Sequence, residues 1–384
     1  MSELDLDYSK VTVELKRRFY DHLTGGLLIV NCVITIALCF WAEMTNLFKI
    51  ENPEDHQIAY SLIMWSLGTV SLLLNSLTVY LILRKSTSDI AGYKNYILNF
   101  TIADIMFSCF LSFFLQPVAI VPGGGMQILG LLKVFGGFIG HVQFTLIAFI
   151  FSHSIVGLNY CFVYRYANLC DIGARRLLEK SWYRFALIGS GEFACFSIAL
   201  LIYDMRVPEQ HFRNVTLQRF PYQSHLLENA VYFGYDYKNS PHANIFLWTA
   251  LLLAPLSCGF NFLCAALIIK RLQQYRQQLT NRTYHLHLKL LVALLMQTTI
   301  PLFLFILPIM YIFLSTILLL SGPLTNTLTR YIPVVALALH PIINPCITII
   351  FIEPYRRAVT PEFLIKRRET QTTTMTITNV TVLT

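Results

Sequence analysis

Eight long apolar stretches, separated by short charged segments, dominate the pattern of hydrophobic and polar positions along the chain. They are residues 25–42, 58–83, 96–121, 128–163, 185–203, 245–269, 288–320 and 331–352. Because about 20 mostly apolar residues suffice for a helix to cross a bilayer, each stretch is a candidate transmembrane helix. Of the charged residues, only Asp104, Lys133, Glu192 and Lys289 fall inside these stretches. Since charge inside a bilayer is costly, the pattern predicts an all-α membrane protein.

The first stretch is ambiguous, and the other seven predict the architecture. Residues 25–42 are marginal in length for a span and follow a basic segment. The segment 1–57 therefore holds a signal anchor or extra helix, a cleaved signal peptide with a long leader, or an artefact of gene prediction. The remaining stretches predict a seven-helix transmembrane bundle over residues 58–353. Residues 354–384 are expected to form a short interfacial segment followed by an unfolded threonine-rich tail.

Lysine and arginine crowd alternate gaps between the stretches. With Lys133 and Lys289 counted in the gaps next to them, twenty-two fall in one set of gaps, which includes the first 24 residues and the tail, and seven fall in the other set. Basic residues mark the cytoplasmic side of membrane proteins, so the seven-helix bundle is expected to begin outside the cell and to end with a cytoplasmic C-terminus. The basic loops are also expected to contact anionic lipid of the bilayer.

The composition agrees with a membrane location and changes the meaning of the net charge. The chain is 55% hydrophobic and 13% charged, whereas soluble domains carry about 25% charged residues. The net charge of +8 is explained by the basic loops, so no nucleic-acid partner is expected.

Cysteines and a glycosylation sequon fit this orientation. All nine cysteines fall within the stretches or on the cytoplasmic side, so no external disulfide is expected. The sequence Asn214-Val215-Thr216 lies in the long external segment 204–242 and predicts glycosylation at Asn214.

Five polar residues are predicted to share one layer inside the bundle. A rise of 1.5 Å per residue, counted from the cytoplasmic helix ends, places each about 12–15 Å deep. They are Asn75, Asp104, Glu192, Gln297 and Asn344. Because lipid offers no hydrogen-bond partner, such groups face one another or a wet cavity, as structural contacts or as parts of a switch. The structural interpretation suits Asn75 and Gln297, whereas the ionisable Asp104 and Glu192 favour a switch.

Prolines in the last three stretches predict kinks that a switch can use. They are Pro255, Pro301, Pro308, Pro341 and Pro345. Each proline frees a backbone carbonyl and favours a bend, although membrane helices also tolerate proline without using it. Pro301, Pro308 and Pro345 join the polar layer in the predicted switch.

Four motifs, at residues 91–99, 164–166, 297–301 and 354–357, together resemble those of nematode serpentine chemoreceptors of the Str superfamily. Gln297-Thr298-Thr299-Ile300-Pro301 is similar to the QT-x-IP element of their sixth helix, and Tyr164-Arg165-Tyr166 to the YRY element that ends their third. Pro354-Tyr355-Arg356-Arg357 resembles the segment after their seventh helix, and residues 91–99 resemble the opening of their second. The likeness covers residues 58–359.

Placement within the superfamily is mixed. The QT-x-IP and YRY elements favour the str and srd branches, while residues 340–356 and 117–122 are closer to the srh or sri branches. The resemblance implies a G-protein-coupled receptor of chemosensory neurons, in the plasma membrane and its sensory cilium. Such a receptor binds a small environmental molecule and activates a heterotrimeric G protein.

Comparison with rhodopsin-like receptors gives agreements and a departure. Asn75, Asp104 and the pair Asn344-Pro345 resemble buried residues of their first, second and seventh helices. Tyr164 stands where those receptors have an acid before the arginine, so the usual acid contact of Arg165 is not expected.

Two sets of candidate site residues follow, one for each end of the bundle. Depth in the outer half predicts a ligand pocket lined by His141, Gln143, Thr145, Trp248 and Tyr311. The inner face is expected to couple to the G protein through Tyr164, Arg165, Tyr166, Arg271, Tyr355 and Arg356. The sixth helix is expected to move about Pro301 or Pro308 and so to expose Arg165; the simpler interpretation of Arg165 is a topogenic charge.

Other classes of protein are less consistent with the sequence. No enzyme motif, cofactor motif or metal-spaced set of His and Cys residues occurs in it, so neither an enzyme nor a cofactor is expected. Gly123-Gly124-Gly125 predicts a tight external turn between two helices. A seven-helix ligand-gated channel would have an external C-terminus, and a secondary transporter would show inverted repeats, which the sequence lacks.

Overall fold

The structure is a computed structural model that describes residues 53–86, 91–120, 123–170, 172–221, 224–228, 230–237, 239–278, 280–307, 309–310, 313 and 327–359. The chain divides into two compact units, Met1–Ala59 and Tyr60–Thr384. Residues 53–59, the first turns of helix α2 (Pro53–Lys85), are the described part of the first unit. The stretch 25–42, Pro308, Tyr311 and the tail from residue 360 lie outside the described residues.

Long apolar helices form where the sequence predicts them. Six helical segments of the described residues are long and apolar enough to cross a membrane. They comprise α2, α3 (Ala91–Ser108) with its π-helical extension η2 (Cys109–Leu115), α4 (Gly136–Cys170), α6 (Ser181–Asp204), α9 (Pro241–Gln274) and α12 (Thr327–Phe351). Helix α10 (Asn281–Pro301), which continues into the π-helical segment η5 (Leu302–Ile306), is a further long helix.

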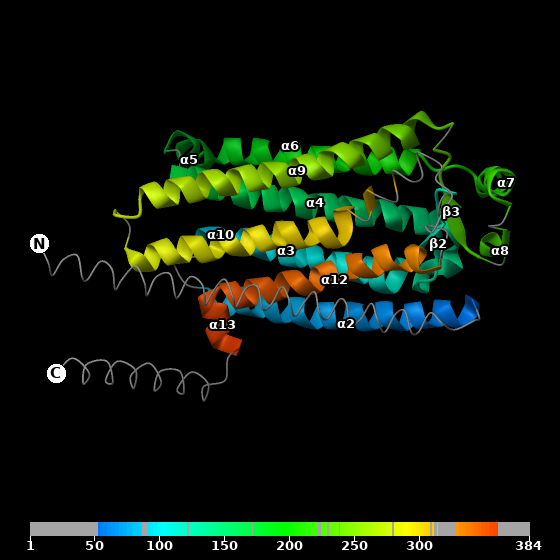
Figure 1. The fold of residues 1–384 in the computed structure, drawn as a ribbon, viewed down its shortest axis with the longest axis horizontal. Helices are drawn as coiled ribbons and strands as arrows, with labels where there is room; N and C mark the ends of the chain where they lie inside the picture. The colour runs from blue at the N-terminus through cyan, green and yellow to red at the C-terminus, as the bar shows by residue number, and fades with distance from the viewer. Residues whose placement is uncertain are drawn as a thin grey trace, which may run out of the picture. The chain divides into compact units, whose positions relative to one another are not determined.

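Helix α4 lies at the centre of the packing and contacts α3, α6 and α9 (Figure 1). One apolar cluster joins α4, α9 and α10 through Leu158, Cys161, Phe162, Cys264, Ala265, Ile268, Leu291 and Leu294. A second cluster joins α2, α3, α10 and the short helix α13 (Glu353–Val359) through Leu81, Ile82, Ile97, Leu290, Ile352 and Tyr355. Burial of these side chains inside the bundle fixes which helices are neighbours.

A three-stranded antiparallel sheet closes one end of the bundle. Its strands are β1 (Pro117–Ile120), β2 (Gly125–Ile128) and β3 (Tyr232–Gly234), in the order β1-β2-β3. With the helices α7 (Glu209–Arg219) and α8 (Ser224–Leu227) the sheet forms what we call the cap (Figure 1). Ile120, Phe212, Leu227 and Tyr232 pack together in it. The Phe212 ring lies so close to Gly125 and Gly234 that a Cβ at either position would collide with it.

The cap departs from the helical spans expected for this region. Residues 117–121 were expected to continue a span, and Gly123-Gly124-Gly125 to form a plain turn. Instead the helix ends at Gln116, whose φ of 44° is left-handed, and a hairpin pairs Pro117 with Ile128. Pro117 suits β1 because this strand is at the edge of the sheet, where a missing N–H breaks no ladder bond. The prediction of glycines in a turn holds for Gly124, which has a φ of 77°.

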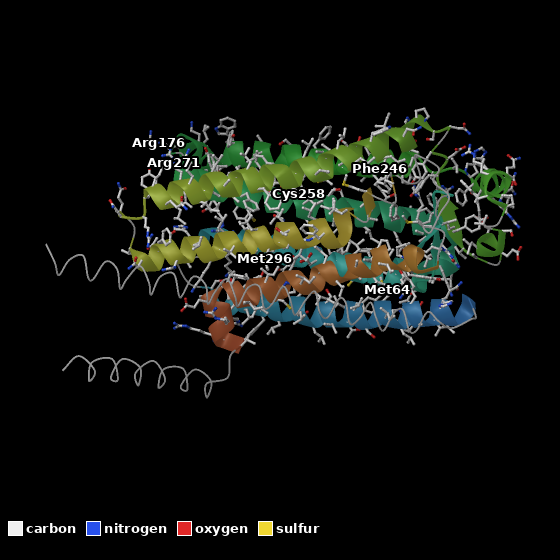
Figure 2. The ribbon with its side chains drawn as sticks, in the orientation of Figure 1. Met64, Arg176, Phe246, Cys258, Arg271 and Met296 are labelled. Atoms are coloured by element: carbon white, nitrogen blue, oxygen red, sulfur yellow. The ribbon has the colours of Figure 1, made fainter. Side chains whose placement is uncertain are left out.

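The opposite end of the bundle is rich in basic side chains. Arg176 of the short helix α5 (Ile172–Glu179) and Arg271 of α9 both lie there, whereas Phe246 lies towards the cap (Figure 2). Helix α13 is anchored at this end because the Tyr355 hydroxyl is 2.8 Å from the hydroxyl of Ser86. We call this the basic end.

Candidate functional site

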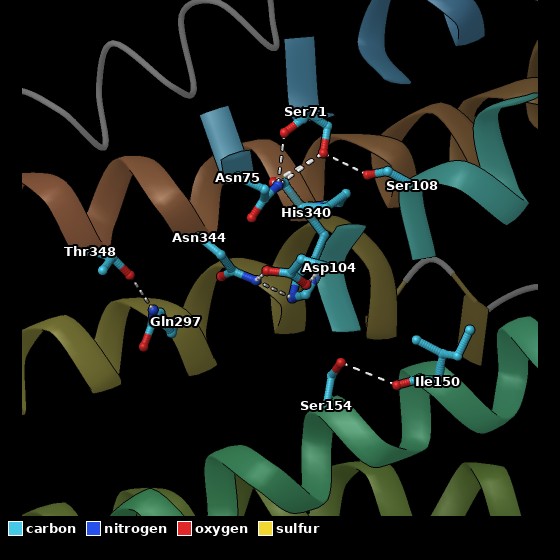
Figure 3. A network of polar contacts seen from close by, with 11 residues as sticks. Ser71, Asn75, Asp104, Ser108, Ile150, Ser154, Gln297, His340, Asn344 and Thr348 are labelled. Carbon is cyan, nitrogen blue, oxygen red and sulfur yellow. Dashed lines mark hydrogen bonds and ion pairs between the residues drawn. The ribbon is translucent and has the colours of Figure 1, made fainter. Parts of the chain in front are cut away.

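A buried polar network joins α2, α3 and α12 in the middle of the bundle (Figure 3). Pro345 has no N–H to donate to the carbonyl of Pro341, one helical turn earlier, so that carbonyl needs another donor. Asn75 supplies it: its Nδ2 donates to Pro341 O at 2.7 Å and to Ser71 O at 2.9 Å. The Ser71 hydroxyl also lies 3.3 Å from Pro341 O and 2.5 Å from the Ser108 hydroxyl. The network therefore exists because Pro345 interrupts α12.

Asp104 and Asn344 form the second part of the network. Asn344 Nδ2 donates to Asp104 Oδ2 at 3.0 Å and is 3.2 Å from His340 Nε2. Since an amide nitrogen only donates, His340 Nε2 accepts and the ring proton lies on Nδ1, 3.9 Å from Asp104 Oδ1. All three side chains are buried. Asp104 thus has two neighbours on α12, and its contact with that helix depends on its own charge state.

The remaining members of the predicted polar layer lie apart from Asp104. Gln297 of α10 donates to the Thr348 hydroxyl of α12 at 3.4 Å. Glu192 of α6 is 2.7 Å from His153 Nδ1 of α4 and is partly exposed at the helix surface. Because Nδ1 donates to the carboxylate, Nε2 accepts from Asn99 Nδ2 at 3.0 Å, which leaves the neutral imidazole fully paired. Glu192 differs from the expectation because α6 lies beside α4, and not beside α2 and α12.

At the cap end, the predicted ligand residues occupy different environments. His141 is completely buried; its Nε2 donates to Tyr203 O at 3.0 Å and its Nδ1 is 3.2 Å from the Tyr235 hydroxyl. Both ring nitrogens are therefore used, Nε2 to bond α6 and Nδ1 to hold Tyr235 beside β3. The Thr145 hydroxyl donates to His141 O within its own helix, and Trp248 is 53% exposed on α9. A helix in a bilayer presents such side chains to lipid, so Trp248 does not point into the bundle.

Gln143 is the exception among these residues. Its side chain is 5% exposed, and neither its Oε1 nor its Nε2 has a hydrogen-bond partner within the described part of the chain. A buried amide that lacks partners costs roughly 1–3 kcal/mol per group. Such a group is expected where a ligand supplies the missing bonds.

At the basic end, Arg165 and Tyr355 point inward. Arg165 is 6% exposed and lies near enough to His287 of α10 for their charges to interact. Tyr164 stacks near Tyr96, with 5.3 Å between ring centroids, and Tyr166 packs on the α4–α9–α10 cluster. Tyr355 is fully buried, and Arg356 Nη1 donates to Ile350 O at 3.2 Å. Arg271 is exposed and donates to Gln274.

Helix α10 has an irregular turn next to the predicted hinge. Its α-helical hydrogen bonding ends at Pro301, and residues 302–306 form the π-helix η5. A proline followed by a wider turn is a typical place for a helix to bend. Pro308 lies outside the described residues, and the hinge at Pro301 stays a prediction.

Comparison with known proteins places the chain in a family. A family model described as the serpentine type 7TM GPCR chemoreceptor Sri matches residues 53–359. The chain belongs to this family. Three curated relatives are serpentine receptors of Caenorhabditis elegans. Class delta-19 is 28% identical over 77% of this chain and 85% of the relative; class delta-18 is 26% identical over 77% and 86%. Class delta-32 is 25% identical over 81% of this chain and 88% of the relative.

These findings confirm the resemblance to nematode serpentine chemoreceptors, including its mixed sri-like and srd-like character. They also confirm the seven-helix transmembrane fold. The serpentine receptor is thus a multi-pass membrane protein of the chemosensory G-protein-coupled type, and not an enzyme.

Sequence reasoning overlooked several polar residues of this receptor. They are His153, His340, Tyr235 and Arg330. His153 and His340 could have been found as polar side chains within apolar stretches, by the argument already used for Asp104. Tyr235 gave no such signal, because its role depends on a strand that the charged external segment did not predict.

Proposed function

We propose that this serpentine receptor binds a small environmental molecule in the cap-end half of the bundle and activates a heterotrimeric G protein at the basic end. Family membership supports a chemosensory receptor of this general kind. The observation that carries the proposal is a single buried face of α4 that runs from Gln143 to Arg165. Its members are Gln143, Ile147, Ile150, Ser154, Leu158, Cys161 and Arg165.

This face connects the two proposed sites within one rigid element. Twenty-two residues of helix correspond to about 33 Å, enough to cross the bilayer. Beside its middle, Phe107 of α3 and His340 of α12 pack against Phe151, the residue after Ile150, with ring centroids 5.9 Å and 6.2 Å away. Next to this face, α4 therefore contacts α3 and α12, two of the helices that carry the polar network. A ligand that favours one packing of these helices over another shifts the population of receptor states.

The proposed ligand contact is the Gln143 amide. It offers two N–H donors and one carbonyl acceptor without a protein partner among the described residues. A small molecule with a hydrogen-bond acceptor would satisfy the Nε2 donors and would lower the cost of the unpaired amide. His141, which is already paired with Tyr203 of α6 and with Tyr235 beside β3, is assigned a structural role.

The proposed coupling residue is Arg165. In the structure it is buried near α10, so a G-protein helix reaches it only after α10 moves. The bend at Pro301 and η5 supplies a place for that movement. A ligand that binds the open state about 100-fold more tightly contributes roughly 2.7 kcal/mol to opening, which is within the range of receptor switches.

The proposed orientation puts the cap outside the cell and the basic end in the cytoplasm of a sensory cilium. Basic loops at one end support it, as does the exposed Asn214 of α7, which belongs to the cap. An epitope after Thr384 should be reached by antibody only after cells are permeabilised, and peptide-N-glycosidase should shift wild type but not Asn214→Gln. Labelling of the epitope on intact cells would overturn the orientation and favour a channel.

The function is tested by adding a library of volatile and water-soluble compounds to reporter cells that express the receptor. For a compound that activates the G protein, Gln143→Leu should weaken binding about ten-fold or more, because one buried hydrogen-bonded group is lost. Thr145→Val is the matched control, since its hydroxyl is bonded within α4. Arg165→Ala should abolish G-protein activation and leave ligand binding in place. Unchanged activation in Arg165→Ala would remove Arg165 from coupling.

A further inference from the structure

Arg330 is a buried positive charge at the cap end of α12. Its side chain is 7% exposed, and its Nε donates to the carbonyl of Ala119 in β1 at 2.9 Å. Its Nη2 is buried and has no hydrogen-bond partner in the described part of the chain. A guanidinium stays protonated in proteins, so it cannot reduce this cost by losing its charge. An arginine in this position requires a partner.

The surroundings hold the Arg330 side chain in place. The Ile128 N–H donates to Val231 O beside β3, so the backbone groups of Ile128 face away from β1. Its pair on β1, Pro117, therefore turns its carbonyl to the free edge of the sheet, and Ala119, two residues further along the strand, does the same. Arg330 takes the Ala119 carbonyl, and Tyr60 takes the Pro117 carbonyl at 2.8 Å. Tyr331 packs on Tyr60, with 4.9 Å between ring centroids. With Nε fixed, the outer edge of the guanidinium, Nη1 and Nη2, remains for another group.

Two acidic side chains near the cap, Asp204 and Asp236, have other partners, and Glu209 and Glu228 are exposed. Asp204 is 2.5 Å from His242, and Asp236 is bonded to His211 and Arg219. The sequence from Leu302 to Thr329 contains no Asp or Glu. Within the described part of the second unit, Arg330 therefore has no carboxylate partner, although a buried charge is tolerated only when it is paired.

We propose that Arg330 is the charge partner of an anionic ligand, so that the activating compounds of this receptor are small carboxylates. The inference rests on the proposed function, because it names the chemical class of the receptor's ligand. A carboxylate accepts two parallel N–H bonds from the Nη1–Nη2 edge of arginine, a geometry that a neutral alcohol or amide does not reproduce. Binding would give a carboxylate partner to a buried charge that contacts the Ala119 carbonyl and the Tyr331 ring.

The test measures binding and signalling separately. Purified full-length receptor is heated with carboxylates from acetate to decanoate, and with the alcohol and primary amide of each chain length. Reporter cells that express the same receptor receive the same compounds. We expect one or more carboxylates to raise the melting temperature and to activate the G protein, while the matched alcohols and amides do neither at equal concentration.

Variants identify the residue. Arg330→Gln should weaken the carboxylate effect roughly thirty-fold or more, as for loss of one member of a buried charge pair. Arg330→Lys should retain part of it, because the charge remains and the two-pronged geometry is lost. Arg213→Gln, at an exposed arginine of α7, is the control and should respond like wild type. Surface expression of each variant shows whether it folds.

The outcomes separate this inference from the proposed function. If neutral compounds activate the receptor and Arg330→Gln leaves their potency unchanged, the anion site is wrong and the receptor function stands. If carboxylates stabilise the protein through Arg330 but no compound activates a G protein, the anion site stands and the receptor function fails. Nanodiscs with and without phosphatidylserine supply the last arm. Stabilisation through Arg330 by the anionic lipid alone would also overturn the proposal of a small ligand.

Discussion

Replacement of Asn75 by alanine tests whether the polar network compensates for the proline in α12. Asn75 Nδ2 has two hydrogens, and its shortest contacts are Pro341 O at 2.7 Å and Ser71 O at 2.9 Å. Asn75→Ala removes both bonds and leaves Pro341 O with the Ser71 hydroxyl at 3.3 Å. The variant should therefore lower the stability of the folded receptor.

The size of the effect follows from these contacts. A net hydrogen bond contributes about 0.5–1.5 kcal/mol in proteins, and bonds between membrane helices average about 0.6 kcal/mol. Two bonds therefore give a loss of about 1–2 kcal/mol. At roughly 2–4 °C per kcal/mol for a chain of this size, the melting temperature should fall by roughly 2–8 °C. Asn168→Ala is the control, because the exposed Asn168 bonds only within α4, to Tyr164 O at 2.9 Å.

A double-mutant cycle with Pro345→Ala makes the test specific. An alanine at 345 restores the N–H that can donate to Pro341 O, so Asn75→Ala should cost less than half as much in that background. Unfolding is followed with a thiol-reactive dye, since Cys161, Cys195, Cys258 and Cys264 are buried in the folded protein. Equal losses from Asn75→Ala in both backgrounds would refute the assignment of Asn75 to the carbonyl freed by Pro345.

Two further predictions concern ionisable pairs. Burial disfavours the Asp236 carboxylate, but hydrogen bonds from His211 and Asn239 and the charge of Arg219 outweigh it and hold the pKa of Asp236 below its usual value. Asp236 therefore stabilises the cap above about pH 4 and loses this effect as the pH falls further. Hydrogen exchange in α7 should rise below about pH 4 in wild type but not in Asp236→Asn. The same pH dependence of exchange in both proteins would contradict this role of Asp236. His153→Ala leaves the Glu192 carboxylate unpaired, so it should destabilise the receptor more than His153→Ala combined with Glu192→Leu. If the double variant is less stable than His153→Ala alone, the cost of His153→Ala does not come from an unpaired Glu192 carboxylate.

The sequence was sufficient to predict the helices, because transmembrane helices follow from composition alone. Long apolar runs and sparse charge leave few alternatives to helices in a bilayer, since every backbone group must be bonded within its own segment. The cap was not predictable on the same grounds. β1 and β2 together span only residues 117–128, and the pairing of β2 with Tyr232–Gly234 joins segments about a hundred residues apart. A hydrophobic run such as residues 117–121 is equally consistent with a helix end and with a short strand.

Depth predicted some polar neighbours and not others, for a physical reason. Counting residues along each helix gives the height of a side chain in the bilayer but not the direction in which it points. Asp104 and Asn344 share both height and direction, and they are bonded. Glu192 shares only the height, because it lies on α6 and faces His153 of α4. Gln143 and His141 differ in the same way, since two residues along a helix turn the side chain by about 200°.

The polar contacts of α2 and α12 suggest how events at the cap reach the middle of the membrane. Near the cap, Tyr60 of α2 and Arg330 of α12 bond adjacent outward carbonyls of β1. Eleven residues further along α12, about 16 Å away, Pro341 is bonded to Asn75 of α2. The two helices are thus joined at two heights, and α12 carries Asn344 and its bond to Asp104 between the second contact and the basic end. An anion on the Nη1–Nη2 edge of Arg330 would act at the upper contact, where Nε is bonded to Ala119, while the lower contact held. A tilt of α12 about Pro341 is the movement that this arrangement permits, and it would change the packing of α12 on α10 and therefore the burial of Arg165.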